Sequence, residues 1–376
     1  MIEHTRSTLA LAGVVLLAIF MFGKIDHTVP PFSSWDLVAY LNMAEAAPGL
    51  ADNVGLPYAS RLLGPLLAGL GPLPAPEMFR IFTIMTSLVL PLLFFRFLTE
   101  RGLDRNSALT AVILFVLNKQ FFGFNLWNYF QLNDMLGLLF LAVLFGAMLR
   151  GRWVLFGVIL FLGAMTRETT MIMVPVAVLY LWDEGRLKKE GGRLLAAAVP
   201  GVVLLIVLKL ALPARGFTIL GAFKNYSVKA AAWRTWFYLF VNSVAPLTFL
   251  PLVFYHRTAA FFRARRYALL FVALVSLSAF FGSNNERLMA PVFVVFYWLI
   301  ADILAAEFAA GPSGARWFLV LCGLAAAFHQ TYTRFGFLEK PLVVGLSLGS
   351  LLLVTIASIM FAIRRKKGTR SGLAGS

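Results

Sequence analysis

Cysteine and histidine are scarce in this chain, which argues against whole classes of chemistry. Cys322 is its only cysteine, so neither an internal disulfide framework nor a cysteine-based metal site can form. The four histidines are scattered and show no HExxH or similar metal-binding spacing. Phosphate-loop, dinucleotide and kinase motifs are also lacking, as are a fixed-period repeat and two matching six-span halves.

Charged residues are scarce as well. They make up 13% of the 376 residues, whereas a soluble domain carries about a quarter. Hydrophobic residues make up 60%, more than a soluble core can use, and a bilayer accommodates this surplus. The net charge of +16 reflects membrane topology rather than nucleic-acid binding, because the lysines and arginines cluster in short loops between apolar runs.

The apolar runs predict an all-α, polytopic bundle forming a single transmembrane domain over residues 1–376. The first run, 7–23, has no small-residue cleavage site after it and is predicted to be an uncleaved signal anchor. Twelve spans are expected in total, at 7–23, 78–98, 107–123, 134–149, 153–165, 169–182, 194–212, 237–255, 267–282, 288–307, 317–330 and 341–363.

Residues 24–76 form the first long loop between spans. Two amphipathic pieces, Ser33–Ala47 and Tyr58–Leu70, are too short and too polar to cross a bilayer. They are predicted to be interfacial helices.

The apolar run from Trp153 to Trp182 is interrupted by Arg167 and Glu168. One helix of this length would measure about 45 Å, against a hydrocarbon core of about 30 Å. Two short helices meeting at the charged pair are therefore expected.

With that split, most basic loops fall on one side, which the positive-inside rule makes cytoplasmic. Both termini are then cytoplasmic, including the basic tail 364–376. The opposite, outer face receives the polar loops, and ionisable groups at such depth are usually functional. The short loops and the high content of Arg, Ala and Gly suggest that the protein belongs to a bacterial inner membrane.

Asp36 is the first candidate functional residue, and Tyr40 shares its helix face at a spacing of four. Desolvation at the membrane edge would raise the pKa of Asp36 and suit it to act as a general base. Ser33 and Asp36 equally match a capping box, in which Asp36 only closes a helix N-terminus.

Five more residues place charge on the outer face. Arg61 lies among apolar neighbours and either clamps a phosphate or reaches lipid headgroups. Arg167 and Glu168 form either a mutual ion pair that caps two helices or the polar floor of a cavity. Arg287 follows an Asn-Asn pair typical of a tight hairpin, but it also faces outward, where it could meet a lipid phosphate. Asp134 stands where an ordinary helix would start, but it is also a second carboxylate on the outer face.

Five short segments, in this order, resemble the GT-C superfamily of integral membrane glycosyltransferases. The segment Trp35–Ala44 is similar to the Trp-Asp…Tyr…Ala element of that family, and the others follow its Tyr-x-x-Arg-x-Leu-x-Pro, Asn-Asp, Thr-Arg-Glu and Glu-Arg-Leu-x-x-Pro elements. These others are Tyr58–Leu66, Leu132–Asp134, Met165–Thr169 and Glu286–Pro291.

The resemblance implies transfer of a sugar from a polyprenyl-phosphate donor to a lipid, glycan or protein acceptor at the outer membrane face. Asp36 would be the catalytic base. No second acidic residue stands beside it, which favours an enzyme without a metal or other cofactor. The substrate-binding residues would be Tyr40, Arg61, Asp134, Arg167, Glu168, Glu286 and Arg287.

Two other classes of function fit parts of the pattern. A transporter or lipid flippase shares the twelve-span layout, but it would place polar residues near the bilayer midplane in matching halves. A non-catalytic assembly subunit would tolerate loss of Asp36. The enzyme reading predicts that Asp36, Arg61, Arg167 and Arg287 line one cavity, with Asp36 within about 15 Å of the two later arginines.

Overall fold

The computed structural model describes residues 2–23, 36–129, 131–213, 218–243, 245–282, 284–308 and 340–373, together with 317, 320 and 321. Within these ranges the chain is helical and contains no strand. The longer helices are α1 (Ile2–Phe22), α4 (Ala75–Glu100), α5 (Arg105–Val116), α6 (Leu132–Leu149), α7 (Trp153–Ala164), α8 (Met173–Asp183), α9 (Leu187–Ala211), α14 (Arg266–Ser278), α16 (Phe293–Phe308) and α18 (Lys340–Leu373).

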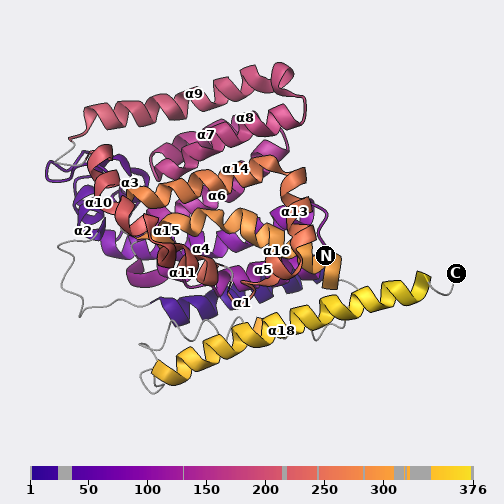
Figure 1. Ribbon diagram of the computed structural model, residues 1–376. Helices are drawn as coiled ribbons and strands as arrows, with labels where there is room; N and C mark the ends of the chain where they lie inside the picture. Colours follow the sequence, from indigo (N-terminus) through magenta and orange to yellow (C-terminus); the bar gives the residue numbers. More distant parts are fainter. Residues whose placement is uncertain are drawn as a thin grey trace.

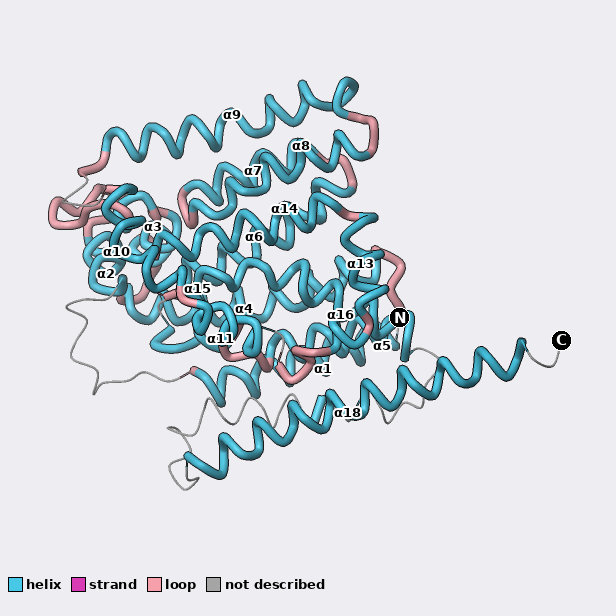
Figure 2. The backbone as a smooth tube through the Cα atoms, viewed as in Figure 1, coloured by secondary structure: helices cyan, strands magenta, loops and turns pink. Residues whose placement is uncertain are grey.

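Shorter elements connect these helices. They are α2 (Asp36–Glu45), η1 (Tyr58–Ser60), α3 (Leu63–Gly69), η2 (Gly123–Tyr129), η3 (Glu168–Ile172), α10 (Ile219–Ala231), α11 (Trp233–Ser243), α12 (Leu250–Val253), α13 (Tyr255–Ala264), η4 (Ala279–Phe281), α15 (Asn285–Met289) and η5 (Ala290–Val292). The long helices run side by side, with α9 along one edge of the bundle and α18 along the opposite edge (Figures 1 and 2).

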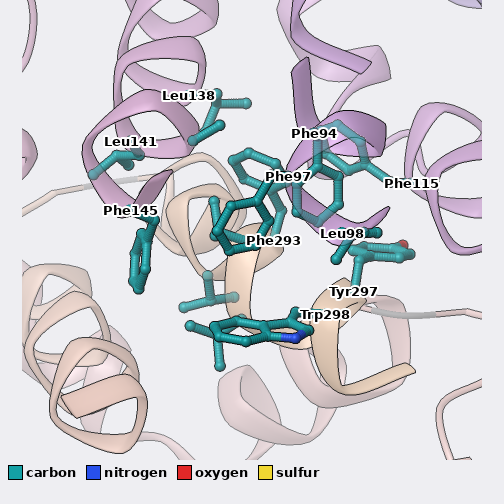
Figure 3. Packing of buried hydrophobic residues seen from close by; sticks show 14 of the residues in the cluster. Phe94, Phe97, Leu98, Phe115, Leu138, Leu141, Phe145, Phe293, Tyr297 and Trp298 are labelled. Atoms are coloured by element: carbon teal, nitrogen blue, oxygen red, sulfur yellow. The ribbon is translucent and has the colours of Figure 1, made fainter. Parts of the chain in front are cut away.

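Aromatic side chains fill the centre of the bundle. Phe94 of α4 contacts Phe293 of α16 with ring centroids 5.1 Å apart, and Phe115 of α5 stacks on the same ring at 4.4 Å. Phe97 and Trp298 extend this cluster (Figure 3). Such pairs contribute about 0.5–1.5 kcal/mol each beyond the area they bury. The core therefore holds α4, α5, α6 and α16 together and provides a rigid base for the loops at their ends.

The number of helices that can cross a membrane is smaller than predicted. By length and composition, five qualify: residues 5–22 of α1, α4, α6, α9, and the run Arg287–Phe308. A sixth is counted if α13 and the following helix, bent by 98° relative to each other, form one broken span. Helices α5 and α7 are apolar but shorter. The chain is an integral membrane bundle, and the count of twelve is not confirmed by the described residues.

One predicted span is wrong. Residues 237–255 do not form a single helix, because α11 ends at Ser243 and α12 covers only Leu250–Val253. Pro246 lies in the interruption, where a proline lacks the N–H needed to continue a helix and disfavours helical geometry before it. Residues 322–330 of the predicted span 317–330 lie outside the described residues, as do 24–35 of the first loop.

The split of the run 153–182 is confirmed. Helix α7 ends at Ala164, and η3 and α8 follow. Glycine contacts show that α7 and α9 run in the same direction, since a Cβ on Gly157 would meet Ala197 and one on Gly201 would meet Leu160. Helix α8 turns directly into α9, so α8 runs back against α7. The charged pair therefore lies where the chain reverses direction.

The bundle has two chemically different ends. At one end, which we call the basic end, Arg105 donates to Ser7 at 2.8 Å, Trp153 donates to Glu190 at 2.8 Å, and Arg150 pairs with Glu100. Arg266 pairs with Asp183 there as well. This end gathers the loops that the sequence assigns to the cytoplasm. Helices α2, α3 and α10 lie together at the other end (Figure 1).

Cysteine labelling of intact cells should place the two ends on opposite sides of the membrane. Asn53 and Lys189 are both exposed, one near each end. In a Cys322→Ser background, Lys189→Cys is expected to react only after permeabilisation, and Asn53→Cys is expected to react from outside. Labelling of both positions from one side would contradict the assignment of the two ends.

Candidate active site

Three arginines, one lysine and three carboxylates from distant parts of the chain meet at the end of the bundle opposite the basic end. Asp36, Arg61, Arg167 and Arg287 line one cavity of about 180 Å³, as predicted from the sequence. The cavity lies between the first loop, the start of η3 and the segment that precedes α15. This clustering is confirmed, and the roles of the residues stay predictions.

Asp36 opens α2 and lies between two arginines. Its carboxylate pairs with Arg287 and lies 3.9 Å from Arg61. Arg61 also donates to the hydroxyl of Tyr40 at 3.0 Å, which places the Asp36 and Tyr40 face of α2 against this guanidinium. Arg61 is 9% exposed, so it does not reach lipid headgroups. Ser33 lies outside the described residues, so the capping-box alternative for Asp36 remains open.

The backbone around Arg61 is fixed by the start of α6. Asn133 accepts from the backbone N–H of Gly64 at 3.1 Å and donates to the carbonyl of Arg61 at 3.3 Å. A Cβ on Gly64 would lie only 2.5 Å from the Asn133 side chain, so this approach requires glycine. Leu63 additionally donates to the carbonyl of Met165 at 2.9 Å. These bonds hold Arg61 against both later segments of the site.

Asp134, in the first turn of α6, forms the inner part of the network. It pairs with Arg167, and its other oxygen lies 2.8 Å from Nε of Arg287. Asp134 and Arg167 are 7% and 8% exposed, so each requires a partner of opposite charge. Arg287 therefore bridges the two carboxylates, Asp36 and Asp134. The alternative in which Arg167 and Glu168 pair only with each other is wrong.

Glu168 belongs to a third group of charges. Its carboxylate accepts from Lys209 at 2.8 Å and lies 3.6 Å from Arg61. Ser60 lies within 3.5 Å of the same carboxylate and 3.4 Å of Lys209. Lys209 stands in the last turn of α9 and was not among the predicted site residues. The signal that could have identified it is a lysine inside an apolar run.

Three aromatic residues at the cavity were not among the predicted site residues either. Tyr58, Tyr226 and Phe281 line it beside the arginines. The side chain of Glu286, a predicted site residue, lies outside the described part of the chain, although its backbone belongs to α15. Among the described residues, no three side chains of His, Cys, Asp or Glu gather in a way that could hold a metal ion.

Neighbouring cations determine the ionisation of two of the carboxylates, Asp36 and Glu168. Burial acts to raise the pKa of Asp36, but the charges of Arg287 and Arg61 outweigh it, and the pKa lies below its usual value. The expected upward shift is therefore wrong. Burial also acts to raise the pKa of Glu168, yet Arg61 and Lys209 lower it to about 2. Both groups are ionised at neutral pH.

Acid should destabilise the protein through these two carboxylates. The pKa of Glu168 is 4.5 in the unfolded chain and about 2 in the folded protein. The ionised Glu168 therefore stabilises the folded protein above about pH 4.5, and this stabilisation is lost as the pH falls towards about 2. Between about pH 5 and pH 3 the unfolding temperature in detergent should fall. In Glu168→Gln that fall should be roughly 2–4 °C smaller. Exposed Glu77→Gln is the control and should follow the wild type; an unchanged fall in Glu168→Gln would contradict the prediction.

The helical bundle and the placement of its charged site beside the first loop define the class of fold. The helical arrangement of this chain is similar to that of a solved protein structure. A solved structure with this fold is that of ArnT from Cupriavidus metallidurans bound to undecaprenyl phosphate, with a TM-score of 0.51 and 16% sequence identity over 95% of this chain and 77% of that one. No protein-family model and no curated protein sequence matches this chain.

Proposed function

We propose that this protein is a membrane glycosyltransferase that moves a sugar from a polyprenyl-phosphate donor to an acceptor at the outer membrane face. The observation that carries the proposal is the convergence of Arg61, Arg167 and Arg287 with Asp36 around one cavity. Arginines recognise phosphate oxygens, and a carboxylate accepts protons. The crystal structure of ArnT with bound undecaprenyl phosphate supports the choice of donor.

The net charge of the network suits such a donor. Four cations, Arg61, Arg167, Lys209 and Arg287, face three carboxylates, so the network carries one net positive charge. A polyprenyl-phosphate sugar is a phosphodiester and carries one negative charge. Its binding would neutralise the site without a further counter-ion.

The charges of the site and of its ligand also balance after the sugar has been transferred. The acceptor oxygen bonds to the anomeric carbon of the sugar, the bond from that carbon to the phosphate oxygen breaks, and its electron pair stays on the phosphate. The acceptor proton passes to Asp36. Asp36 thereby loses its charge while the released phosphate, now a monoester, approaches two negative charges. The arginines stabilise this developing charge.

Donor binding would also prepare Asp36 for this role. In the structure Arg287 and Arg61 lower the pKa of Asp36, which makes it a weak base. A donor phosphate that draws on the same guanidinium groups would weaken their hold on the carboxylate. The pKa of Asp36 then rises, and its ability to accept the acceptor proton rises with it.

The arrangement of the charges is less suited to a carrier. A transporter concentrates polar groups near the bilayer midplane, between matching halves. Here the network lies where η1, the start of α6, η3 and the end of α9 meet, at one end of the bundle. One-sided placement favours reaction of a lipid-linked substrate at a single membrane surface.

Binding of polyprenyl phosphate tests the proposal directly. Undecaprenyl phosphate should raise the unfolding temperature of the purified protein, because a ligand at about 100 times its Kd stabilises by about 2.7 kcal/mol. The neutral alcohol undecaprenol, which has the same chain, should give a much smaller shift. Equal shifts from the two lipids would show that only the apolar chain is recognised and would overturn the phosphate site.

A further inference from the structure

A large cavity in the described part of the chain lies away from the site, between α7 and α9. It is a groove of about 1230 Å³ that opens to the outside of the bundle. Its wall is mainly apolar and includes Val154, Val158 and Phe161 of α7 and Ala196 and Pro200 of α9. Pockets for drug-sized molecules measure about 300–1,000 Å³. This groove exceeds that range, and its lining suits hydrocarbon chains.

Small residues create the groove by letting the two helices approach closely. A Cβ on Gly157 would lie 2.9 Å from the carbonyl oxygen of Ala197, and one on Gly201 would lie 3.2 Å from the backbone of Leu160. Small residues permit such contact in membrane helices. The larger side chains of Val154 and Val158 then stand beside the contact line, 84% and 53% exposed.

Two arginines stand at the basic end of this groove. Arg152 precedes α7, Arg193 belongs to the first turns of α9, and both line the groove and are exposed. Neither guanidinium forms a hydrogen bond or an ion pair with another residue in the described part of the chain. The neighbouring carboxylate of Glu190 already accepts from Trp153 at 2.8 Å and from Arg186 at 2.7 Å. Glu190 thus has Arg186 as its ion-pair partner, and Arg152 and Arg193 add positive charge at this end that attracts an external anion.

We propose that the α7–α9 groove binds one anionic phospholipid, with its acyl chains along the groove and its phosphate at Arg152 and Arg193. Paired basic residues between membrane helices attract anionic headgroups. The groove reaches Leu162, and Arg167 does not line it, so its charged end is distinct from the proposed catalytic cavity. The lipid headgroup would lie at the basic end, in the opposite leaflet from the sugar donor.

Lipid binding by the full-length protein can be measured without any enzymatic activity. Delipidated protein in detergent micelles is titrated with phosphatidylglycerol or with phosphatidylcholine of the same acyl chains, and bound lipid is counted by native mass spectrometry. The wild type should retain one phosphatidylglycerol with a preference of about tenfold over phosphatidylcholine. The double variant Arg152→Gln/Arg193→Gln should lose that preference.

Two further variants separate charge from shape. Lys188→Gln/Lys189→Gln removes the same charge from the same end of α9, outside the groove, and should keep the preference. Ala196→Trp fills the groove without changing charge and should reduce binding of both lipids. An unchanged preference in the double-arginine variant, or unchanged binding in Ala196→Trp, would overturn the proposal. So would tighter binding of undecaprenyl phosphate than of phosphatidylglycerol that is lost in Ala196→Trp.

Discussion

Asp36→Asn is expected to abolish sugar transfer while the protein remains folded and inserted in the membrane. Asparagine keeps the size of aspartate, can still accept a hydrogen bond from Arg287, and caps a helix as well as aspartate does. It cannot take a proton from an attacking hydroxyl. Loss of a general base typically lowers the rate by about 10²–10⁴-fold. Loss of a capping interaction alone costs only about 1 kcal/mol of stability.

The measurement is complementation of a knockout's glycan phenotype, with protein level in the membrane checked in parallel. Glu45→Gln is a matched control, because Glu45 belongs to the same helix α2 and is exposed. It should complement fully. Full complementation by Asp36→Asn at normal expression would remove Asp36 as the base and leave capping as its role.

Arg287→Lys should lower kcat by about 10²–10³-fold, comparable to the loss of one donor that stabilises transition-state charge. Lysine keeps the positive charge but cannot reproduce the planar fork of a guanidinium. Arg287 uses separate nitrogens for Asp36 and Asp134, and one ammonium group cannot hold both carboxylates in the same positions. If the fork acts on the leaving phosphate, as we propose, the effect should be larger on kcat than on KM.

Arg80→Lys on α4 provides the control. Its side chain is 47% exposed and pairs with Glu77, also on the surface, so this change should leave transfer within about twofold. Near-normal turnover by Arg287→Lys would show that a single positive charge is enough at this position. Loss of membrane insertion would instead identify Arg287 as structural, as expected for a group that bridges two buried carboxylates.

Individual candidate residues were predictable because charged side chains in apolar runs are costly and therefore conspicuous. Arg61 and Arg167 were identified in this way, and Asp36, Asp134 and Arg287 from their places at the outer face. Lys209 was not predicted as a site residue, because one lysine near the end of an apolar run is also typical of a side chain that reaches lipid headgroups. Tyr226 was not predicted either, because no local sequence pattern distinguishes an isolated tyrosine on α10 as a cavity residue.

The sequence did not predict which of these charged residues pair with each other. Arg167 and Glu168 are adjacent, yet Arg167 pairs with Asp134 and Glu168 with Arg61 and Lys209. The direction of the Asp36 pKa shift reversed for the same reason. Burial alone raises the pKa of a carboxyl, and only the packing of α15 against the first loop brings Arg287 close enough to lower it.

By itself, the sequence determined that the chain is a helical membrane protein whose polar residues collect on one side, because hydropathy and loop charge are local properties of the chain. It also determined that the run 153–182 must reverse at Arg167, since a single helix of that length exceeds the bilayer. The tertiary structure alone decided which carboxylate meets which arginine and where the α7–α9 groove lies. Those contacts join residues up to 251 positions apart, and no local pattern encodes them.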